Sequence, residues 1–260
     1  MSVPVKEVAF LRYCLVLAYD GTDYHGWQIQ EGVATIQEEV QKAVGMVIGE
    51  PIQVAGASRT DAGVHAYGNL AVFDAETTIP AEKLAVVINQ NLPGNIRVMQ
   101  SFGVADGFDL RKNKGEKTYR YRYFIGDIMP PLYERFAVHV PYRIQVRAMK
   151  EAGKYYEGEH DFAAFCAAGA QVLTTVRTVN QVSVEVTPAI GGEFLDIFVK
   201  GEGFLYNMVR IMSGTLLQVG MGRKEPVWVK DAIESCQREQ AGSTAPAKGL
   251  TLMGTSLDKE

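Results

Sequence analysis

The chain has 260 residues, of which 47% are hydrophobic and 22% are charged, and its formal net charge is -4. This size and composition can bury one large hydrophobic core or two smaller ones. No stretch approaches the about 20 apolar residues of a membrane-spanning helix. The apolar segment 8–18 is broken by Arg12 and runs into Tyr19-Asp20-Gly21, which predicts a strand and not a signal peptide. We therefore expect a cytoplasmic protein.

The cysteines and histidines make metal and disulfide chemistry unexpected. Cys14, Cys166 and Cys236 are odd in number, far apart and set among apolar neighbours, which predicts buried free thiols in a reducing compartment. None of the four histidines stands at ligand spacing with another histidine or a cysteine. The chain also lacks the glycine-rich motifs that hold nucleotide phosphates. We therefore expect no metal and no cofactor.

The first half of the chain predicts strands and helices in mixed order. The expected elements are a strand at 12–18, a helix at 35–48, strands at 52–57 and 69–73, a helix at 81–91 and a strand at 96–104. Thr35 lies three residues before Glu38, which is the pattern of a capping box, and Pro80 introduces the second helix.

The second half repeats this theme after the polar stretch 105–116. The expected elements are a strand at 117–125, a helix at 146–156, strands at 178–186 and 194–200, and a helix at 207–219. Mixed element order with short connections predicts an α+β fold with sheets rich in antiparallel strands. The halves are predicted to be two domains, residues 1–107 and 108–260.

The positive charge is concentrated in one stretch. Residues 110–124 contain six basic side chains and one acidic side chain, a local charge of +5 that leaves -9 for the remainder of the chain. We call this stretch the basic stripe, and its cations are Arg111, Lys112, Lys114, Lys117, Arg120 and Arg122. An acidic body with such a stripe is compatible with a nucleic-acid partner, because backbone phosphates require positive surface.

Within the basic stripe, aromatic and basic side chains alternate from 117 to 123. In a strand, Tyr119, Tyr121 and Tyr123 would share one face and Arg120 and Arg122 the other. An ordinary half-buried strand with solvated arginines explains this pattern. The alternative is a tyrosine stacked on a nucleobase beside cations that hold phosphates. The pattern on its own favours the ordinary strand.

A short polar loop between two expected strands carries the strongest sign of chemistry. The sequence Ser58-Arg59-Thr60-Asp61-Ala62-Gly63-Val64-His65 places one carboxylate beside one guanidinium on a glycine-assisted turn. Strands that present a polar loop are a common support for a catalytic group. A surface ion pair between Arg59 and Asp61 accounts for the same residues. A carboxylate hydrolase would need a second acid at a further motif, which the sequence does not offer.

The loop at 59–65 resembles the catalytic loop of the TruA family of transfer RNA pseudouridine synthases. Further segments match this family in order along the chain: Tyr19 to Gln28, Asn91-Leu92-Pro93-Gly94, Phe108 to Arg111, Lys117 to Tyr121, Phe204 to Arg210, Thr244-Ala245-Pro246 and Gly249-Leu250. The resemblance implies two ferredoxin-like halves whose sheets meet around a central cleft. It also implies a homodimer that isomerises uridine at positions 38, 39 and 40 of the anticodon stem-loop without a cofactor.

The resemblance assigns roles to individual residues. Asp61 is the nucleophile or base, Arg59 extrudes the target nucleotide, Tyr119 stacks on the uracil and Arg210 pairs with Asp61. The residues expected to contact the substrate are Arg111, Lys112, Lys114, Lys117, Arg120, Phe204 and Leu205. His65 is expected to be a packed or capping histidine. Alternatives are an RNA-binding pseudoenzyme or chaperone and a pseudouridine synthase with another RNA target.

One position departs from the pattern of the family. Ser58 stands where the family usually has glycine immediately before the arginine. If the backbone there required a positive φ, serine would add strain on the order of 1 kcal/mol or more. An extended backbone would accept serine without strain.

Overall fold

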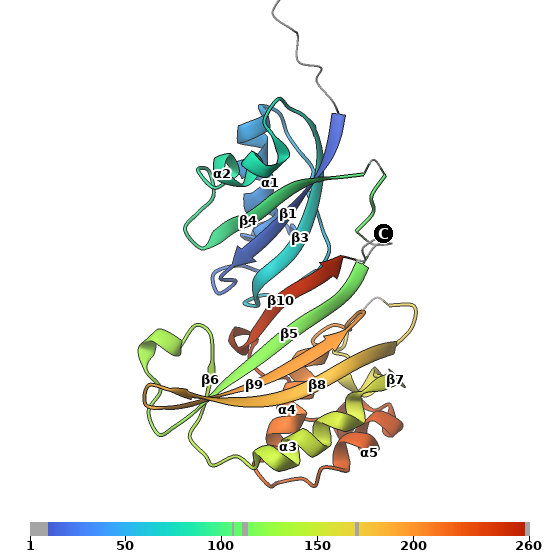
Figure 1. The fold of residues 1–260 in the computed structure, drawn as a ribbon. Coiled ribbons are helices and arrows are strands. Elements are labelled where there is room, and N and C mark those ends of the chain that lie inside the picture. Colours follow the sequence, from blue (N-terminus) through green and yellow to red (C-terminus); the bar gives the residue numbers. More distant parts are fainter. Residues whose placement is uncertain (1–9, 106, 111–113, 170–171, 258–260) are drawn as a thin grey trace, which may run out of the picture. The chain divides into compact units, whose positions relative to one another are not determined.

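The computed structural model of the chain describes residues 10–105, 107–110, 114–169 and 172–257. The chain divides into two compact units, which are described here one at a time. Unit 1 comprises Met1–Lys114 and Leu257–Glu260, and unit 2 comprises Gly115–Ser256. Both units combine antiparallel sheets with helices (Figure 1), so the predicted α+β class is confirmed. The predicted domain boundary at 107/108 and the meeting of the two sheets around a cleft stay predictions.

Unit 1 is built on an antiparallel sheet whose central strand is β1. Strand β1 (Phe10–Tyr19) pairs with β3 (His65–Glu76) on one side and β4 (Ile96–Val104) on the other, and the short strand β2 (Ala55–Gly56) adds to β3. Helix α1 (Ile36–Ile48) and the one-turn helix α2 (Leu84–Ile88) lie side by side against this sheet (Figure 1).

Burial on both faces of β1 explains its position. Tyr13, Leu15 and Leu17 are at most 1% exposed, and the ring of Tyr13 stacks on Phe73 of β3 at 5.4 Å. Cys14 packs in a second cluster on the same strand. A central strand that is covered on both faces loses most of its apolar surface to the core, at about 25 cal/mol for each Å² removed from water. It therefore makes a rigid base for the loops at its end.

The start of α1 differs from the predicted capping box. Thr35 occupies the N-cap with an extended backbone, but its side chain makes no cap hydrogen bond, and its Oγ1 is buried without a partner among the described residues. The first two N–H groups of α1, from Ile36 and Gln37, donate instead to the carbonyls of Gly26 and Trp27 at 3.1 and 3.0 Å. The helix end is thus satisfied by a distant backbone segment, which replaces a local side-chain cap.

Other expectations for unit 1 hold with shifted ends. The strands at 12–18 and 96–104 and the helix at 35–48 are confirmed. The strand predicted at 52–57 pairs only at Ala55–Gly56, whereas the one at 69–73 extends over the whole of β3. The helix predicted at 81–91 is a 3-10 turn, Ala81–Lys83, followed by α2.

Unit 2 contains a larger, mostly antiparallel sheet. Its strands lie in the order β10 (Leu250–Leu257), β5 (Lys114–Ile125), β9 (Gly192–Gly201), β8 (Val176–Ala189) and β7 (Gly158–Asp161), with β6 (Val138–Val140) parallel to β5. Helices α3 (Val146–Gly153), α4 (Met208–Gly220) and α5 (Trp228–Ser235) gather on one side of it (Figure 1).

Helix α4 is the core helix of unit 2. Ile211, Met212 and Leu216 are fully buried, and a Cβ on Gly214 would lie 2.0 Å from the carbonyl oxygen of Ser243. The hydrophobic segment 211–219 could equally have formed a subunit interface on sequence grounds. Its burial within unit 2 accounts for its apolar character without a partner.

The sequence predicts the long elements of unit 2 and misses the short ones. The strands at 117–125, 178–186 and 194–200 and the helix at 207–219 are confirmed with ends shifted by a few residues. The helix at 146–156 consists of α3 and a 3-10 turn, Lys154–Tyr156. Strands β6, β7 and β10 and helix α5 were not expected. No helix in the described part of the chain is long and apolar enough to cross a membrane.

The three free thiols differ in burial. Cys14 is buried, and desolvation raises the pKa of its thiol to about 12. Cys166 is half-buried, and burial also raises its pKa. Cys236 is exposed, so the expectation of three buried thiols is wrong there. The apolar residues before Cys236 belong to α5, and the cysteine itself ends that helix with a left-handed φ of 53°.

Replacing Cys236 with glycine is expected to stabilise the protein. A left-handed conformation costs an L-residue about 1–2 kcal/mol, and glycine avoids this strain while losing more chain entropy on folding. The net gain in the free energy of unfolding is about 0.5–1 kcal/mol. Urea unfolding measures it, with Cys236→Ala as the control that removes the thiol and keeps the strain. Equal stability of the two variants would contradict the prediction.

Candidate active site

The loop that carries Asp61 is anchored to the buried ends of β1 and β3. The hydroxyl of Tyr19 is 2.8 Å from Oγ1 of Thr60. Nδ2 of Asn69 donates to that Tyr19 oxygen at 3.1 Å and to the carbonyl of Ser58 at 3.0 Å. Tyr19, Thr60 and Asn69 are all at least nine-tenths buried. This network fixes the backbone on both sides of Arg59, because buried polar groups resist the loss of their partners.

The segment 20–27 holds the same loop from its other side. The N–H of Trp27 donates to the carbonyl of Thr60 at 3.0 Å, and the N–H of Gly63 donates to the carbonyl of Tyr24 at 3.2 Å. Gly26 has a φ of 89°, and a Cβ there would lie 2.6 Å from the oxygen of Thr60. Only glycine fits this approach of two backbones. Asp61 thus stands on a loop clamped at both ends.

Arg59 and Asp61 differ in exposure. Asp61 is half-buried at the turn, where its carbonyl accepts the N–H of Val64 at 3.1 Å. Arg59 is exposed and lines a cavity of about 520 Å³ within unit 1.

The wall of this cavity also carries an ion pair. Arg12 binds both carboxylate oxygens of Asp74 at 2.7 Å and holds the pKa of Asp74 below its usual value. Arg59, by contrast, is a long and exposed cation beside the cavity, so its guanidinium is able to reach a bound polyanion.

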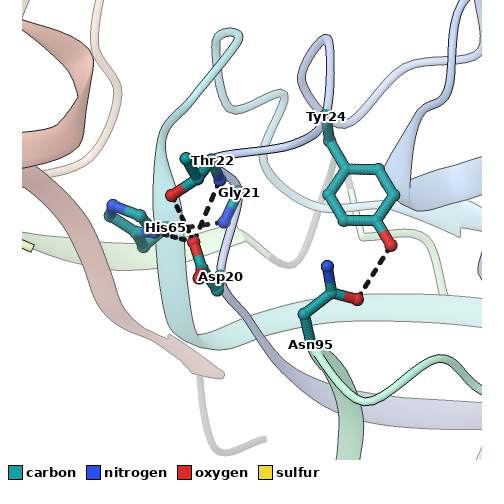
Figure 2. Close-up of polar contacts among 6 residues, drawn as sticks. All are labelled: Asp20, Gly21, Thr22, Tyr24, His65 and Asn95. Atoms are coloured by element: carbon teal, nitrogen blue, oxygen red, sulfur yellow. Dashed lines mark hydrogen bonds and ion pairs between the residues drawn. The ribbon is translucent and has the colours of Figure 1, made fainter. Parts of the chain in front are cut away.

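His65 closes the loop against the first residues of the segment 20–27 (Figure 2). Its side chain is buried, and Nδ1 lies 3.1 Å from the N–H of Gly21 and 3.2 Å from Oδ1 of Asp20. The same Asp20 oxygen accepts the N–H and the hydroxyl of Thr22 at 3.0 and 2.6 Å. The expectation of a packed histidine is therefore confirmed.

Two further hydrogen bonds join the segment 20–27 to Asn95, just before β4. The hydroxyl of Tyr24 donates to Oδ1 of Asn95 at 2.9 Å, just before β4 (Figure 2). The N–H of Asp20 also donates to the carbonyl of Asn95 at 3.0 Å. Asn95, which follows the family-like turn at 91–94, thus supports the same segment that clamps the Asp61 loop.

In unit 2, Tyr119 of β5 lies against a second aromatic ring. Its ring meets that of Phe204 edge to face, with centroids 5.3 Å apart and an interplanar angle of 88°. Leu205 is buried beside Phe204 in the sequence. The other tyrosines of β5 are core residues, since Tyr121 and Tyr123 are fully buried. The edge-to-face contact with Phe204 fixes the orientation of the Tyr119 ring, and a ring in a fixed orientation is suited to stacking on a nucleobase.

Arg210 of α4 is oriented by two bonds within unit 2. Its Nε donates to the carbonyl of Ala245 at 2.8 Å, and its Nη1 donates to Oδ1 of Asn207 at 2.5 Å. Asn207 has a left-handed φ of 59°, which asparagine tolerates better than most residues. The matched segment Thr244-Ala245-Pro246 thus places this guanidinium. A freely solvated arginine on an amphipathic helix is excluded.

The basic stripe is less open than its sequence predicts. Arg122 binds both carboxylate oxygens of Asp196 at 2.7 and 2.6 Å, and it lies over the ring of Phe194 at 4.2 Å. Arg120 is 9% exposed, with its Nε 4.0 Å from the same carboxylate. The alternative of an ordinary strand with solvated arginines therefore does not hold on this face of β5, because Asp196 on the paired strand β9 neutralises them. Phosphate contact by Arg120 stays a prediction.

The remaining stripe cations are described only in part. Lys117 is half-buried on β5. Arg111 and Lys112 lie outside the described residues, and so does the side chain of Lys114. Their contact with RNA also stays a prediction. No group of three or more metal-ligating side chains gathers among the residues that the structure places.

Several supporting residues escaped the sequence analysis. Asn69 carries a signal that could have been used, since an asparagine within an apolar strand must find buried hydrogen bonds. Asp20 and Asn207 stand inside family-like segments without an assigned role. Their roles are to position backbone and side chains, which depends on contacts between distant parts of the chain.

Ser58 does not have the left-handed backbone that would require glycine. The non-glycine residues with positive φ in the described ranges are Asn207 and Cys236. Ser58 is 3% exposed, and its Oγ has no hydrogen-bond partner among the described residues. The departure from the family pattern is therefore harmless to the geometry of the loop.

The Ser58→Gly variant is expected to keep kcat within about twofold of the parent, because no φ strain is present to relieve. The Ser58→Ala variant should fold with equal or slightly higher stability, since it removes a buried hydroxyl. Steady-state kinetics and thermal unfolding test both variants. A severalfold gain in kcat for Ser58→Gly would show that serine distorts the loop.

Known proteins match nearly the full length of the chain. A family model described as tRNA pseudouridine synthase matches residues 15–106 and 152–256. The tRNA pseudouridine synthase A of Brevibacillus brevis is 45% identical over 241 residues, covering 93% of this chain and 97% of that protein. The proteins of the same name from Thermoanaerobacter sp. and Bacillus subtilis are 42% and 39% identical, covering 92% and 95% of this chain and 96% and 100% of their own lengths. The chain therefore belongs to the tRNA pseudouridine synthase family.

Proposed function

We propose that this protein isomerises uridine to pseudouridine at positions 38, 39 and 40 in the anticodon stem-loop of transfer RNA. The observation that carries the proposal is the clamped loop of unit 1, which presents Asp61 between Arg59 and His65 on a rigid base. Membership of the family supplies the reaction and the class of substrate. An RNA-binding protein without catalysis would not require such a fixed carboxylate.

The reaction rearranges one nucleotide and consumes nothing. The bond from C1' of the ribose to N1 of uracil breaks, the base rotates, and C1' bonds to C5. The hydrogen on C5 leaves as a proton, and N1 gains one. A carboxylate can supply the required group as a nucleophile toward the ribose or the base, or as a base toward a sugar proton. Asp61 is assigned this role in each route.

The charged form of Asp61 requires a partner once RNA excludes water from the site. A nearby cation favours a carboxylate over its neutral acid. We assign this role to Arg210, whose Nε and Nη1 are already bound to Ala245 and Asn207. These bonds fix the plane of the guanidinium, so that little side-chain entropy remains to be lost.

The target base must leave the helical stack before Asp61 can reach its glycosidic bond. The exposed side chain of Arg59 is suited to enter the RNA and take the space that the nucleotide leaves. Tyr119 would stack on the extruded uracil, while Phe204 and Leu205 would form the wall of its pocket. The edge-to-face contact of Tyr119 with Phe204 supports this assignment, since it fixes the orientation of the stacking ring.

RNA affinity would come from phosphate contacts. The assigned cations are Arg111, Lys112, Lys114, Lys117 and Arg120. A protein that neutralises several phosphates loses affinity steeply as salt rises. The overall charge of -4 makes this local surface decisive.

We place the enzyme in the cytoplasm as a homodimer. Exposed apolar side chains on neighbouring loops of unit 2 are available for a second copy, among them Ile128 and Ile190, which are 81% and 79% exposed. The loops that carry these two residues lie side by side, since a Cβ added to Gly191 would lie 3.5 Å from the carbonyl oxygen of Ile128. Light scattering should give twice the chain mass of 28.6 kDa. A mass of one chain would contradict the dimer.

Tritium release tests the reaction and its target together. Transfer RNA labelled at C5 of uridine should lose tritium to water when the protein is added, because the new bond at C5 expels that hydrogen. The matched substrate is the same RNA with cytidine at positions 38, 39 and 40, which should release none. Equal release from both RNAs would move the target elsewhere. No release from either RNA would contradict the proposed function.

A further inference from the structure

We propose that His65 is a positioning residue that holds the Asp61 loop only while its Nδ1 carries no proton. This inference rests on the proposed function and adds a proton-dependent contact to it. It starts from the two groups that meet Nδ1 of His65 in Figure 2, the N–H of Gly21 at 3.1 Å and Oδ1 of Asp20 at 3.2 Å.

These two contacts cannot be hydrogen bonds at the same time. The N–H of Gly21 can only donate, so it requires a lone pair on Nδ1. An ionised Asp20 can only accept, so it requires a proton on Nδ1. Neutral imidazole with its proton on Nε2 serves Gly21, whereas imidazolium and the neutral tautomer with its proton on Nδ1 serve Asp20. The presence or absence of a proton on Nδ1 therefore selects between two arrangements of the segment beside the loop, and the imidazolium that forms at low pH always carries that proton.

The rest of the hydrogen bonding favours the Gly21 contact in the working enzyme. Oδ1 of Asp20 already accepts two hydrogen bonds from Thr22. Gly21 is buried, and its amide requires an acceptor within the protein. An unprotonated Nδ1 therefore satisfies the Gly21 amide while Asp20 keeps its bonds from Thr22, whereas a proton on Nδ1 would deprive the Gly21 amide of this acceptor.

The contact matters to Asp61 because Gly21 touches the loop itself. A Cβ on Gly21 would lie 2.0 Å from the carbonyl oxygen of Val64, and the N–H of Val64 donates to the carbonyl of Asp61 at 3.1 Å. A shift of the Gly21 backbone thus passes to Val64 and from there to Asp61. Protonation of His65 would release Gly21 and loosen this chain of contacts.

The other titratable groups on the elements packed around His65 can be separated from it. Tyr19 and Tyr24 stay neutral in the acid range, because burial raises the pKa of Tyr19 to about 12 and also raises that of Tyr24. Asp23 stands in the segment 20–27 and is exposed, and Asp61 stands four residues before His65. Their effects on a pH profile would remain when His65 is replaced, so the variants below distinguish them.

Two replacements of His65 form a matched pair. Asparagine places an oxygen where Nδ1 stands and does not titrate, so His65→Asn keeps the acceptor for Gly21. Leucine has similar bulk and no acceptor. At pH 7.5, His65→Asn is expected to keep kcat within about threefold of the parent, and His65→Leu to lose at least about tenfold in kcat with little change in KM.

The pH profile of kcat is the readout that a purely structural role would not move. Between pH 7.5 and pH 5.5, kcat should fall in both the parent and His65→Asn. The fold-decrease in the parent should be at least about three times that in His65→Asn. In Asp20→Asn, which keeps the acceptor for Thr22 and removes the charge, the acid limb should move to lower pH, because a neighbouring carboxylate favours imidazolium. Identical acid limbs in the parent and His65→Asn would overturn the proposal.

A spectroscopic measurement separates this proposal from the proposed function. In protein labelled with 15N-histidine, Nδ1 of His65 should be unprotonated at pH 7.5 and should take up a proton as the pH falls. This uptake should occur at a lower pH in Asp20→Asn than in the parent, because the variant lacks the carboxylate that favours imidazolium. A proton on Nδ1 at pH 7.5 would overturn the proposed role of His65 even in an active enzyme. Absence of tritium release at every pH, with Nδ1 unprotonated at pH 7.5, would overturn the proposed function and leave the contact between His65 and Gly21 supported.

Discussion

Replacing Asp61 with alanine is expected to abolish turnover while leaving tRNA bound. The expected loss in kcat is about four orders of magnitude or more, which is typical when the central reacting group is removed. The dissociation constant for tRNA should stay within about threefold, because phosphate contacts supply most of the affinity for RNA. Tritium release and filter binding measure the two quantities separately.

The controls for this variant are drawn from the same chain. Asp61→Asn keeps the shape of the side chain and should be as inactive as Asp61→Ala, since the charge carries the chemistry. Asp127→Ala removes an exposed carboxylate in unit 2 and should leave kcat unchanged. The thermal midpoint of Asp61→Ala should stay within a few degrees of the parent, because Asp61 is only half-buried. Substantial turnover by Asp61→Ala would exclude this residue as the catalytic group.

The second large effect is expected at Gly26, which has no catalytic atom. The Gly26→Ala variant would place a Cβ 2.6 Å from the carbonyl of Thr60 and would also adopt an unfavourable φ of 89°. The loop must shift to relieve the contact, and a displacement of about 1 Å can lower a rate by about 10²-fold. We expect kcat to fall by about that factor.

Gly32 offers a matched control for the backbone strain alone. It also has a positive φ, of 77°, but a Cβ there would have open space within 4 Å. Both alanine variants should lose about 1–2 kcal/mol of unfolding free energy from the strained φ, and Gly26→Ala should lose about 1–3 kcal/mol more from the contact. Only Gly26→Ala should lose kcat. Equal kcat in the two variants would show that the clamp by the segment 20–27 does not position the loop.

The sequence predicted those parts of the fold that depend on local patterns. The continuous apolar run of β1 and the periodic apolar face of α1 identify these elements directly, and their ends are close to the prediction. Strand β7 has four residues and β6 has three, which is too short for a period to be recognised. The cap of α1 comes from the carbonyls of Gly26 and Trp27, so that Thr35 was misjudged from local sequence.

The candidate site shows the same limit. Motifs located Asp61 in a loop between strands and Tyr119 on a strand, as the structure has them. They could not reveal that Arg122 is engaged by Asp196, because the two residues are 74 positions apart and meet only through the pairing of β5 with β9. The contact between Asp20 and His65 likewise joins two separate segments. The assignment of roles to the site residues remains a proposal.

The most direct test of the account is the chemical identity of nucleotides 38, 39 and 40 after reaction. Unmodified transfer RNA would be incubated with the parent protein or with Asp61→Ala, digested to nucleosides after isolation of the anticodon stem-loop, and separated by chromatography. The account predicts pseudouridine in the parent reaction and only uridine with the variant. Uridine alone in both reactions, with tRNA binding intact, or pseudouridine in both, would contradict it.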